Sequence, residues 1–178
     1  MPTPDRAPPH EAVQPEFSRP VSVSRLPPDG RFVIEASEGE RAALARRFGL
    51  QSIGRLAAEV RLTRLAGAAV RLDATLEADV VQSCVVTLDP VPAHVADEFT
   101  VVYTPDLDPA DQVELTAEEE DVERLEGDTI DIAEAVAQQL SLALDPYPHA
   151  PGAALPDEAS GGSDAAEHPF AALVKLKR

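Results

Sequence analysis

Apolar and polar residues alternate strictly through the middle of the chain. Over Val70–Val80 every second residue is apolar, and polar residues fill the positions between them. A similar pattern covers residues 56–62, and a small-residue segment at 66–68 can turn the chain between the two runs. A period of two indicates a strand with one buried and one solvated face. The sequence therefore predicts a long β-hairpin built from residues 52–65 and 69–83.

Shorter strand-like segments flank this hairpin. Residues 31–36 (RFVIEA) are typical of a short strand, and residues 17–24 form another, which a proline limits to an edge or entry position. Residues 95–103 alternate again, after a turn at the prolines of 90–92. We expect residues 95–103 to rejoin the hairpin, in a fold that is mainly an antiparallel sheet.

A first helix is predicted just after the early strands. Ser37 and Glu40 form a capping-box pattern, in which each side chain satisfies a backbone N–H of the other residue. Residues 41–48 follow with apolar side chains at helical spacing, and Gly49 is typical of the residue that ends a helix. This helix is short.

A second helix is predicted near the C-terminal end of the foldable part. Asp131 and Glu134 repeat the capping pattern, and apolar residues recur every four positions over Ile132–Leu144. The Asp-Pro-Tyr-Pro sequence of 145–148 ends the helix. Its apolar face should lie on the sheet, so the fold class is α+β, with a central long hairpin and one amphipathic C-terminal helix.

Composition divides the chain into a domain and its appendages. With 178 residues, one domain is expected. The predicted parts are a disordered tail, a single α+β domain, a flexible linker and a short apolar and basic end: residues 1–16, 17–148, 149–167 and 168–178. Within the domain, residues 105–127 hold ten acids against one arginine, which is typical of a solvated acidic loop.

The net charge of −17 is unevenly distributed. Residues 1–71 carry 11 arginines and 8 acids, whereas residues 72–178 carry 4 basic residues and 24 acids. The mean charge argues against a uniformly basic RNA-binding protein. The arginines of the first half remain open to two interpretations: they bind phosphate, or they balance the protein's own acidic half.

Candidate catalytic and metal-binding side chains are sparse. Cys84 is the single cysteine and stands at the end of a predicted strand, where it is either a nucleophile or a small buried side chain. Nothing else in the sequence supports a nucleophile, the four histidines lack metal-ligand spacing, and the glycines form no phosphate loop. We therefore predict no catalytic residue, no metal and no cofactor. Without a secretory leader or an apolar run of about 18 residues, we expect a cytoplasmic protein that contacts no membrane.

Four segments follow one another in a fixed order: the end of the hairpin at 81–90 (VQSCVVTLDP), the close of the acidic stretch at 126–131 (EGDTID), the helix and its end at 132–148, and the C-terminal residues 169–178 (PFAALVKLKR). In this order they resemble the YceD family, the large ribosomal RNA subunit accumulation proteins of bacteria and plastids. Many members have Cys-x-x-Cys after the second hairpin strand. Here Thr87 occupies the second position, so a zinc site that relatives hold there is not expected in this chain.

The resemblance implies a non-enzymatic role in large-subunit ribosomal RNA accumulation and ribosome biogenesis. Two modes of action stay open: binding a basic ribosomal protein or a large-subunit precursor particle, or contacting ribosomal RNA directly through the arginine-bearing half. An uncharacterised enzyme around Cys84 is a third hypothesis, and the oligomeric state is left open. The candidate interaction residues are Arg55, Arg61, Arg64, Arg71, Phe170, Leu173, Lys175, Lys177 and Arg178.

Overall fold

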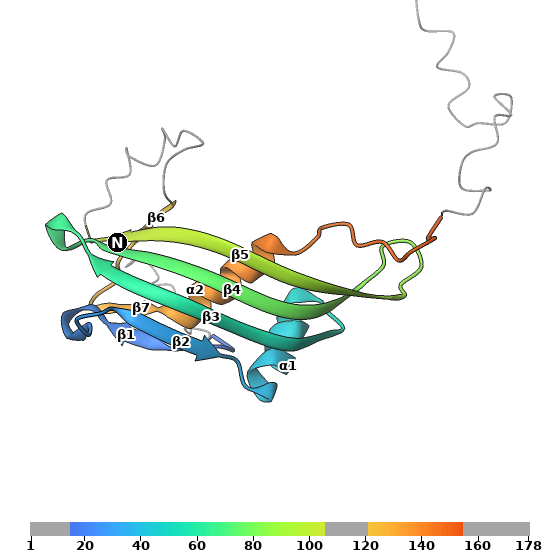
Figure 1. Ribbon diagram of the computed structural model, residues 1–178, viewed down its shortest axis with the longest axis horizontal. Helices are drawn as coiled ribbons and strands as arrows, with labels where there is room; N and C mark the ends of the chain where they lie inside the picture. Colours follow the sequence, from blue (N-terminus) through green and yellow to red (C-terminus); the bar gives the residue numbers. More distant parts are fainter. Residues whose placement is uncertain (1–14, 106–120, 155–178) are drawn as a thin grey trace, which may run out of the picture.

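The computed structural model describes residues 15–105 and 121–154. Its main element is a five-stranded sheet with the strand order β2-β3-β4-β5-β6 (Figure 1). All neighbours are antiparallel except β5 and β6, which are parallel. The strands are β2 (Arg31–Glu35), β3 (Ser52–Arg64), β4 (Val70–Ser83), β5 (Pro90–Thr104) and β6 (Asp121–Arg124).

A second, two-stranded sheet joins distant parts of the chain. Strand β1 (Pro20–Ser22) pairs antiparallel with β7 (Thr129–Asp131). Helix α2 (Ile132–Ala143) begins directly after β7, and α1 (Glu38–Phe48) connects β2 to β3. Two short 3₁₀ turns complete the described elements: η1 (Val23–Arg25) and η2 (Ala66–Ala68).

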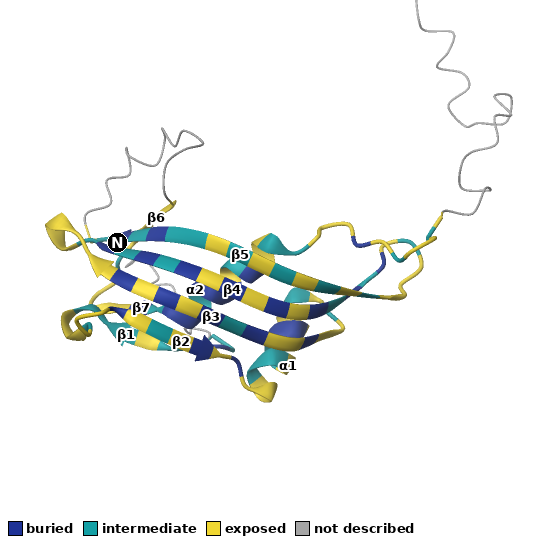
Figure 2. Ribbon diagram, viewed as in Figure 1, coloured by how far each residue is buried: buried dark blue, intermediate teal, exposed yellow. Residues whose placement is uncertain are grey.

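One face of the five-stranded sheet is covered and the other is open. Helix α2 lies across one face, behind the strands in Figure 1, and α1 packs beside β3. Side chains alternate between buried and exposed along β3 and β4 (Figure 2), as a strand with one covered face requires. The core is aliphatic, and its largest fully buried side chains include Phe17, Leu44, Leu56, Leu72, Leu76, Ile132 and Leu140.

The predicted hairpin and helices are confirmed. Strands β3 and β4 pair along almost their whole length, and Leu62 lies opposite Leu72 near the turn. The side chain of Ser37 accepts a hydrogen bond from the backbone N–H of Glu40, which completes a capping box with the reciprocal bond. Gly49 ends α1 with a φ of 68°, the left-handed conformation that glycine adopts without strain.

The start of α2 differs from the predicted capping box in one respect. Asp131 caps the helix by accepting hydrogen bonds from the N–H groups of Ala133 and Glu134, both at 3.2 Å. The Glu134 carboxylate, however, forms an ion pair with Arg47 of α1 at 2.7 Å. This ion pair connects the two helices, which the local sequence pattern does not reveal.

Two predicted boundaries were wrong. Strand β5 begins at Pro90 rather than at residue 95, although prolines usually interrupt strands. The prolines fit here because the outer side of β5 lies at an edge, where a missing N–H removes no ladder bond. Within the predicted acidic loop of 105–127, residues 121–124 form β6, whose four residues are all exposed. They extend the sheet because β5 offers them a free edge at Val101–Thr104. The remainder of that acidic segment, 106–120, lies outside the described residues.

Candidate functional site

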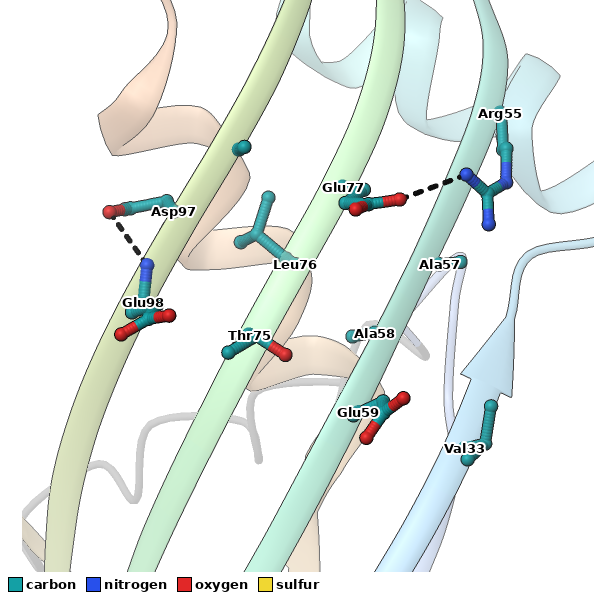
Figure 3. Close-up of a pocket in the computed structure, with 11 residues that line it drawn as sticks. Val33, Arg55, Ala57, Ala58, Glu59, Thr75, Leu76, Glu77, Asp97 and Glu98 are labelled. Carbon is teal, nitrogen blue, oxygen red and sulfur yellow. Dashed lines mark hydrogen bonds and ion pairs between the residues drawn. The ribbon is translucent and has the colours of Figure 1, made fainter.

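The open face of the main sheet carries two rows of side chains in which glutamates alternate with smaller residues. The strand register places Glu35, Ala57, Glu77 and Ala96 in one row, and Val33, Glu59, Thr75 and Glu98 in the next. Neighbouring strands lie about 4.8 Å apart, so glutamates in the same row are separated by roughly 10 Å. We call these eight residues the glutamate rows. All of them except Glu35 line a shallow hollow of about 480 Å³ (Figure 3).

Among the described residues, arginines reach the glutamate rows only from their margins. Arg55 forms an ion pair with Glu77 at 3.0 Å, and Arg31 pairs with Glu59 at 3.2 Å. All four side chains are at least half exposed. Such pairs contribute about 0–1 kcal/mol each, so a partner can displace them easily. Glu35 and Glu98 form no ion pair with the described residues.

Outside the glutamate rows, basic and acidic side chains of the open face lie mostly on different strands. Arg31 and Arg61 are register partners on β2 and β3, and Asp73 follows on β4. The Asp73 carboxylate accepts hydrogen bonds from Arg71 at 2.7 Å and from the Thr100 hydroxyl at 3.1 Å. The β2–β3 side of the face therefore carries most of its guanidinium groups, and the β4–β5 side carries most of its carboxylates.

The structure brings together only some of the candidate interaction residues. Arg55, Arg61 and Arg71 lie on the open face, where Arg55 and Arg71 are engaged by Glu77 and Asp73. Arg64 lies opposite Val70 in the strand register, and Val70 is buried on the helix-covered face, so Arg64 does not belong to the open face. Its guanidinium donates a hydrogen bond to the Val23 carbonyl at 2.6 Å. The remaining candidates, Phe170, Leu173, Lys175, Lys177 and Arg178, lie outside the described residues.

Cys84 occupies a turn that encloses its thiol. The side chain is fully buried, but it lies outside the main hydrophobic cluster. Backbone N–H groups of Val86 and Thr87 donate to Sγ at 3.4 and 3.5 Å. The segment after α2 closes over the turn, since the Val85 N–H donates to the Pro148 carbonyl at 2.9 Å. A hydrogen bond from the Ala150 backbone and another from the Thr87 hydroxyl are the main causes that lower the pKa of Cys84 to about 6.

This environment favours a structural role for the thiol. A nucleophilic cysteine has to meet its substrate, and no part of the Cys84 side chain is exposed. His94, the nearest histidine in sequence, instead contacts Asp79 on the open face at 2.8 Å. Residues 15–105 and 121–154 contain no group of three His, Cys, Asp or Glu side chains able to hold a metal ion. No helix in these ranges is long and apolar enough to cross a membrane.

The glutamate rows were missed by reasoning from the sequence alone. Their members come from four strands, and no two neighbours in a row are adjacent in the chain. The alternation along each strand shows that these side chains face solvent, but only the strand register shows which of them are neighbours.

A comparison with protein-family models identifies one family. The model described as large ribosomal RNA subunit accumulation protein YceD matches residues 72–177, which is more than half of the chain. The chain belongs to the YceD family. The match begins in β4 and covers β5, β6, β7 and α2. No curated protein and no solved structure matches the chain.

The family description agrees with the resemblance drawn from the four sequence segments. It implies a role in the accumulation of large-subunit ribosomal RNA, and it names no reaction. The matched range includes the β4 and β5 contributions to the glutamate rows and the turn around Cys84.

Proposed function

We propose that this YceD-family protein supports large-subunit ribosomal RNA accumulation without catalysis, by binding a basic ribosomal protein through the glutamate rows. The observation that carries this proposal is the open sheet face itself, on which four glutamates alternate with small residues and no described element covers them. The partner is either the free ribosomal protein in the cytoplasm or the same protein on a large-subunit precursor particle.

The geometry of the rows suits lysine and arginine side chains. Ala57, Thr75 and Ala96 leave gaps between the glutamates, and the apolar stem of a basic side chain can lie in such a gap while its charged end meets a carboxylate. The net charge of −17 adds a long-range attraction, which speeds the encounter with a cationic protein.

Direct RNA binding is less well supported by the same surface. Phosphate groups would have to approach the open face past its carboxylates, and like charges repel. Arg55 and Arg71 are engaged by Glu77 and Asp73, so an RNA phosphate would have to displace these acids. A charge-reversal experiment distinguishes the two modes.

The test is co-sedimentation of tagged protein with large-subunit precursor particles at low salt. The test variant combines Glu35→Lys and Glu98→Lys, since both side chains are exposed and form no ion pair with the described residues. The control variant combines Asp121→Lys and Glu126→Lys, which make the same charge change at exposed positions outside the glutamate rows. We expect binding at least about tenfold weaker in the test variant and little changed in the control, because two attractive contacts become repulsive.

Three outcomes would count against the proposal. Equal binding by the test variant and the wild type would reject the glutamate rows as the surface. Equal weakening in both variants would show that only total charge matters. The third outcome has three parts: binding is lost after ribonuclease treatment, it is lost in an Arg31→Glu, Arg61→Glu variant, and it is kept in the test variant. This combination would favour direct contact with RNA.

A further inference from the structure

Strand β5 has a long outer edge without a backbone partner in the described part of the chain. It pairs with β4 from Pro90 to Tyr103, but β6 joins its other side only at Val101–Thr104. The outward-pointing backbone groups of residues 93–100 therefore have no strand partner among the described residues, and the Glu98 N–H donates instead to the neighbouring Asp97 carboxylate at 2.9 Å. Such an edge is a template for another strand, and proteins commonly cover it.

A groove runs along this edge. Ala93, Val95 and Asp97 of β5 form one wall, and Ala143 and Asp145 at the end of α2 form another, around a volume of about 430 Å³. Figure 1 shows the C-terminal end of α2 emerging beside β5. The Asp97 carboxylate is already bound by the Gln139 amide at 2.7 Å. The groove therefore combines apolar side chains with polar ones on the helix-covered side of the edge, and both of its acids, Asp97 and Asp145, already accept hydrogen bonds.

The C-terminal segment Phe170–Lys177 has the pattern of a strand that fits this edge. Phe170, Ala172, Val174 and Leu176 alternate with Ala171, Leu173, Lys175 and Lys177. In an extended conformation, one side of the segment would be entirely apolar and the other would carry both lysines. Its eight residues equal the length of the free edge, residues 93–100.

Charge complementarity supports the same arrangement. On β5, His94 and Glu98 project to the open face, whereas Ala93 and Val95 project to the groove. A strand added at the edge would place its apolar side over the groove. It would then place its lysines on the open face, beside Glu98 at the end of the glutamate rows.

The connecting chain is long enough for this docking. The described residues end at Ala154, six residues after Pro148, whose carbonyl accepts a hydrogen bond from the Val85 N–H in the turn that precedes β5. Fifteen residues rich in Ala, Gly, Ser and Pro separate Ala154 from Phe170. Fifteen residues can span roughly 20 Å as a random coil and up to about 50 Å when fully extended. The family match also continues to residue 177, so the segment belongs to the matched region.

We propose that residues 170–177 pair as a sixth strand with the free edge of β5 in the same chain. The apolar side of this strand covers the groove beside α2, and Lys175 and Lys177 extend the open face. The pairing protects an edge that would otherwise be open to other strands. It does not depend on the proposed ribosomal partner, since every contact is within one chain.

The test is residue-level hydrogen exchange of backbone amides in the full-length protein. In the wild type, the outward-pointing amides of residues 93–100 should be protected. Val174→Pro removes an N–H and the conformational freedom that a strand needs, so these amides should exchange at least about tenfold faster. Ala166→Pro is the matched control in the linker and should exchange like the wild type. Unchanged β3 amides in both variants would show that the domain remains folded.

Two results would overturn the proposal. Identical exchange of residues 93–100 in the wild type and the Val174→Pro variant would show that the segment does not cover the edge. Protection that disappears when the wild type is diluted would assign the pairing to a second copy of the chain instead of the same chain. A Lys175→Glu, Lys177→Glu variant supplies a second readout. Its protection should fall relative to the wild type, and an unchanged value would contradict the placement of the lysines beside Glu98.

Discussion

Asp131 joins the start of α2 to the N-terminal part of the chain, and its replacement should destabilise the fold. One carboxylate oxygen accepts hydrogen bonds from the N–H groups of Ala133 and Glu134, and thereby caps the helix. The same carboxylate accepts from the Arg19 N–H at 2.8 Å and from the Ser18 hydroxyl at 2.5 Å. Two of these four bonds cap the helix locally, and the other two join Asp131 to residues 112 and 113 positions earlier in the chain.

The expected loss for Asp131→Ala can be assembled from these contacts. Removing a helix cap of this kind costs about 1 kcal/mol, with a range of roughly 0.5–2. The partly buried Arg19 N–H also loses its partner, which costs about 1 kcal/mol more. The Ser18 hydroxyl can turn to water, so its contribution is about 0.5 kcal/mol. We therefore expect the free energy of unfolding to fall by about 2–3 kcal/mol.

Urea denaturation at pH 7, followed by circular dichroism, measures this loss directly. Asp131→Asn keeps an accepting oxygen and should lose only about 1 kcal/mol, because the cap can still form. Asp89→Ala is the control: this exposed residue should tolerate the change to within about 0.5 kcal/mol. If the free energy of unfolding of Asp131→Ala lay within about 0.5 kcal/mol of the wild-type value, as expected for the control, this explanation would be refuted.

Three further predictions concern glycine, acid and thiol positions. Gly30→Ala should lower the free energy of unfolding in urea by about 3 kcal/mol or more, because at a φ of +60° the added Cβ would lie 2.1 Å from the Leu62 carbonyl oxygen. Gly67→Ala has a similar φ of +70° but open space around the added Cβ, so it should cost only about 1–2 kcal/mol, and equal losses in the two variants would contradict the steric explanation. Glu40→Gln should destabilise the protein at pH 7 and much less at pH 2, since the hydrogen bond from Arg19 lowers the pKa of Glu40 from 4.5 to about 2 in the fold. The stabilisation is complete above pH 4.5 and is lost as the pH falls through 2, so an equal loss of unfolding midpoint at both pH values would exclude it. Under reducing conditions, the free energy of unfolding of the wild type should rise relative to that of Cys84→Ser between pH 6 and pH 9, because the pKa of Cys84 is lowered from 9.0 to about 6 in the fold. Parallel pH profiles of the two proteins would show that the fold does not stabilise the thiolate.

Local patterns were sufficient to predict the central hairpin and both helices. A period of two predicts β3 and β4 because the sheet is covered on one face only, and this leaves an alternation in the sequence. The capping box at Ser37 involves residues three positions apart, so it is visible without a structure. The aliphatic repeat of α2 indicates correctly that this helix lies on the sheet.

Features that depend on distant partners could not be predicted in the same way. Strands β1 and β7 have three residues each, and their pairing stabilises them more than any local preference does. The glutamate rows require the register of four strands, and the environment of Cys84 requires the segment around Pro148 and Ala150. In each case the deciding neighbour lies many residues away, and no local pattern identifies it.

The pairing of β1 with β7 has a consequence for synthesis of the protein on the ribosome. The N-terminal strand is translated early, but its partner and the carboxylate of Asp131 follow 112 residues after Arg19. At a translation rate of about 5–20 residues per second, roughly 6–22 seconds pass before the two can meet. During that interval the buried residues of α2 are missing from the hydrophobic cluster that contains Phe17, so the nascent chain exposes apolar surface that the finished domain buries. Factors that shield nascent chains should therefore contact this protein until α2 has emerged.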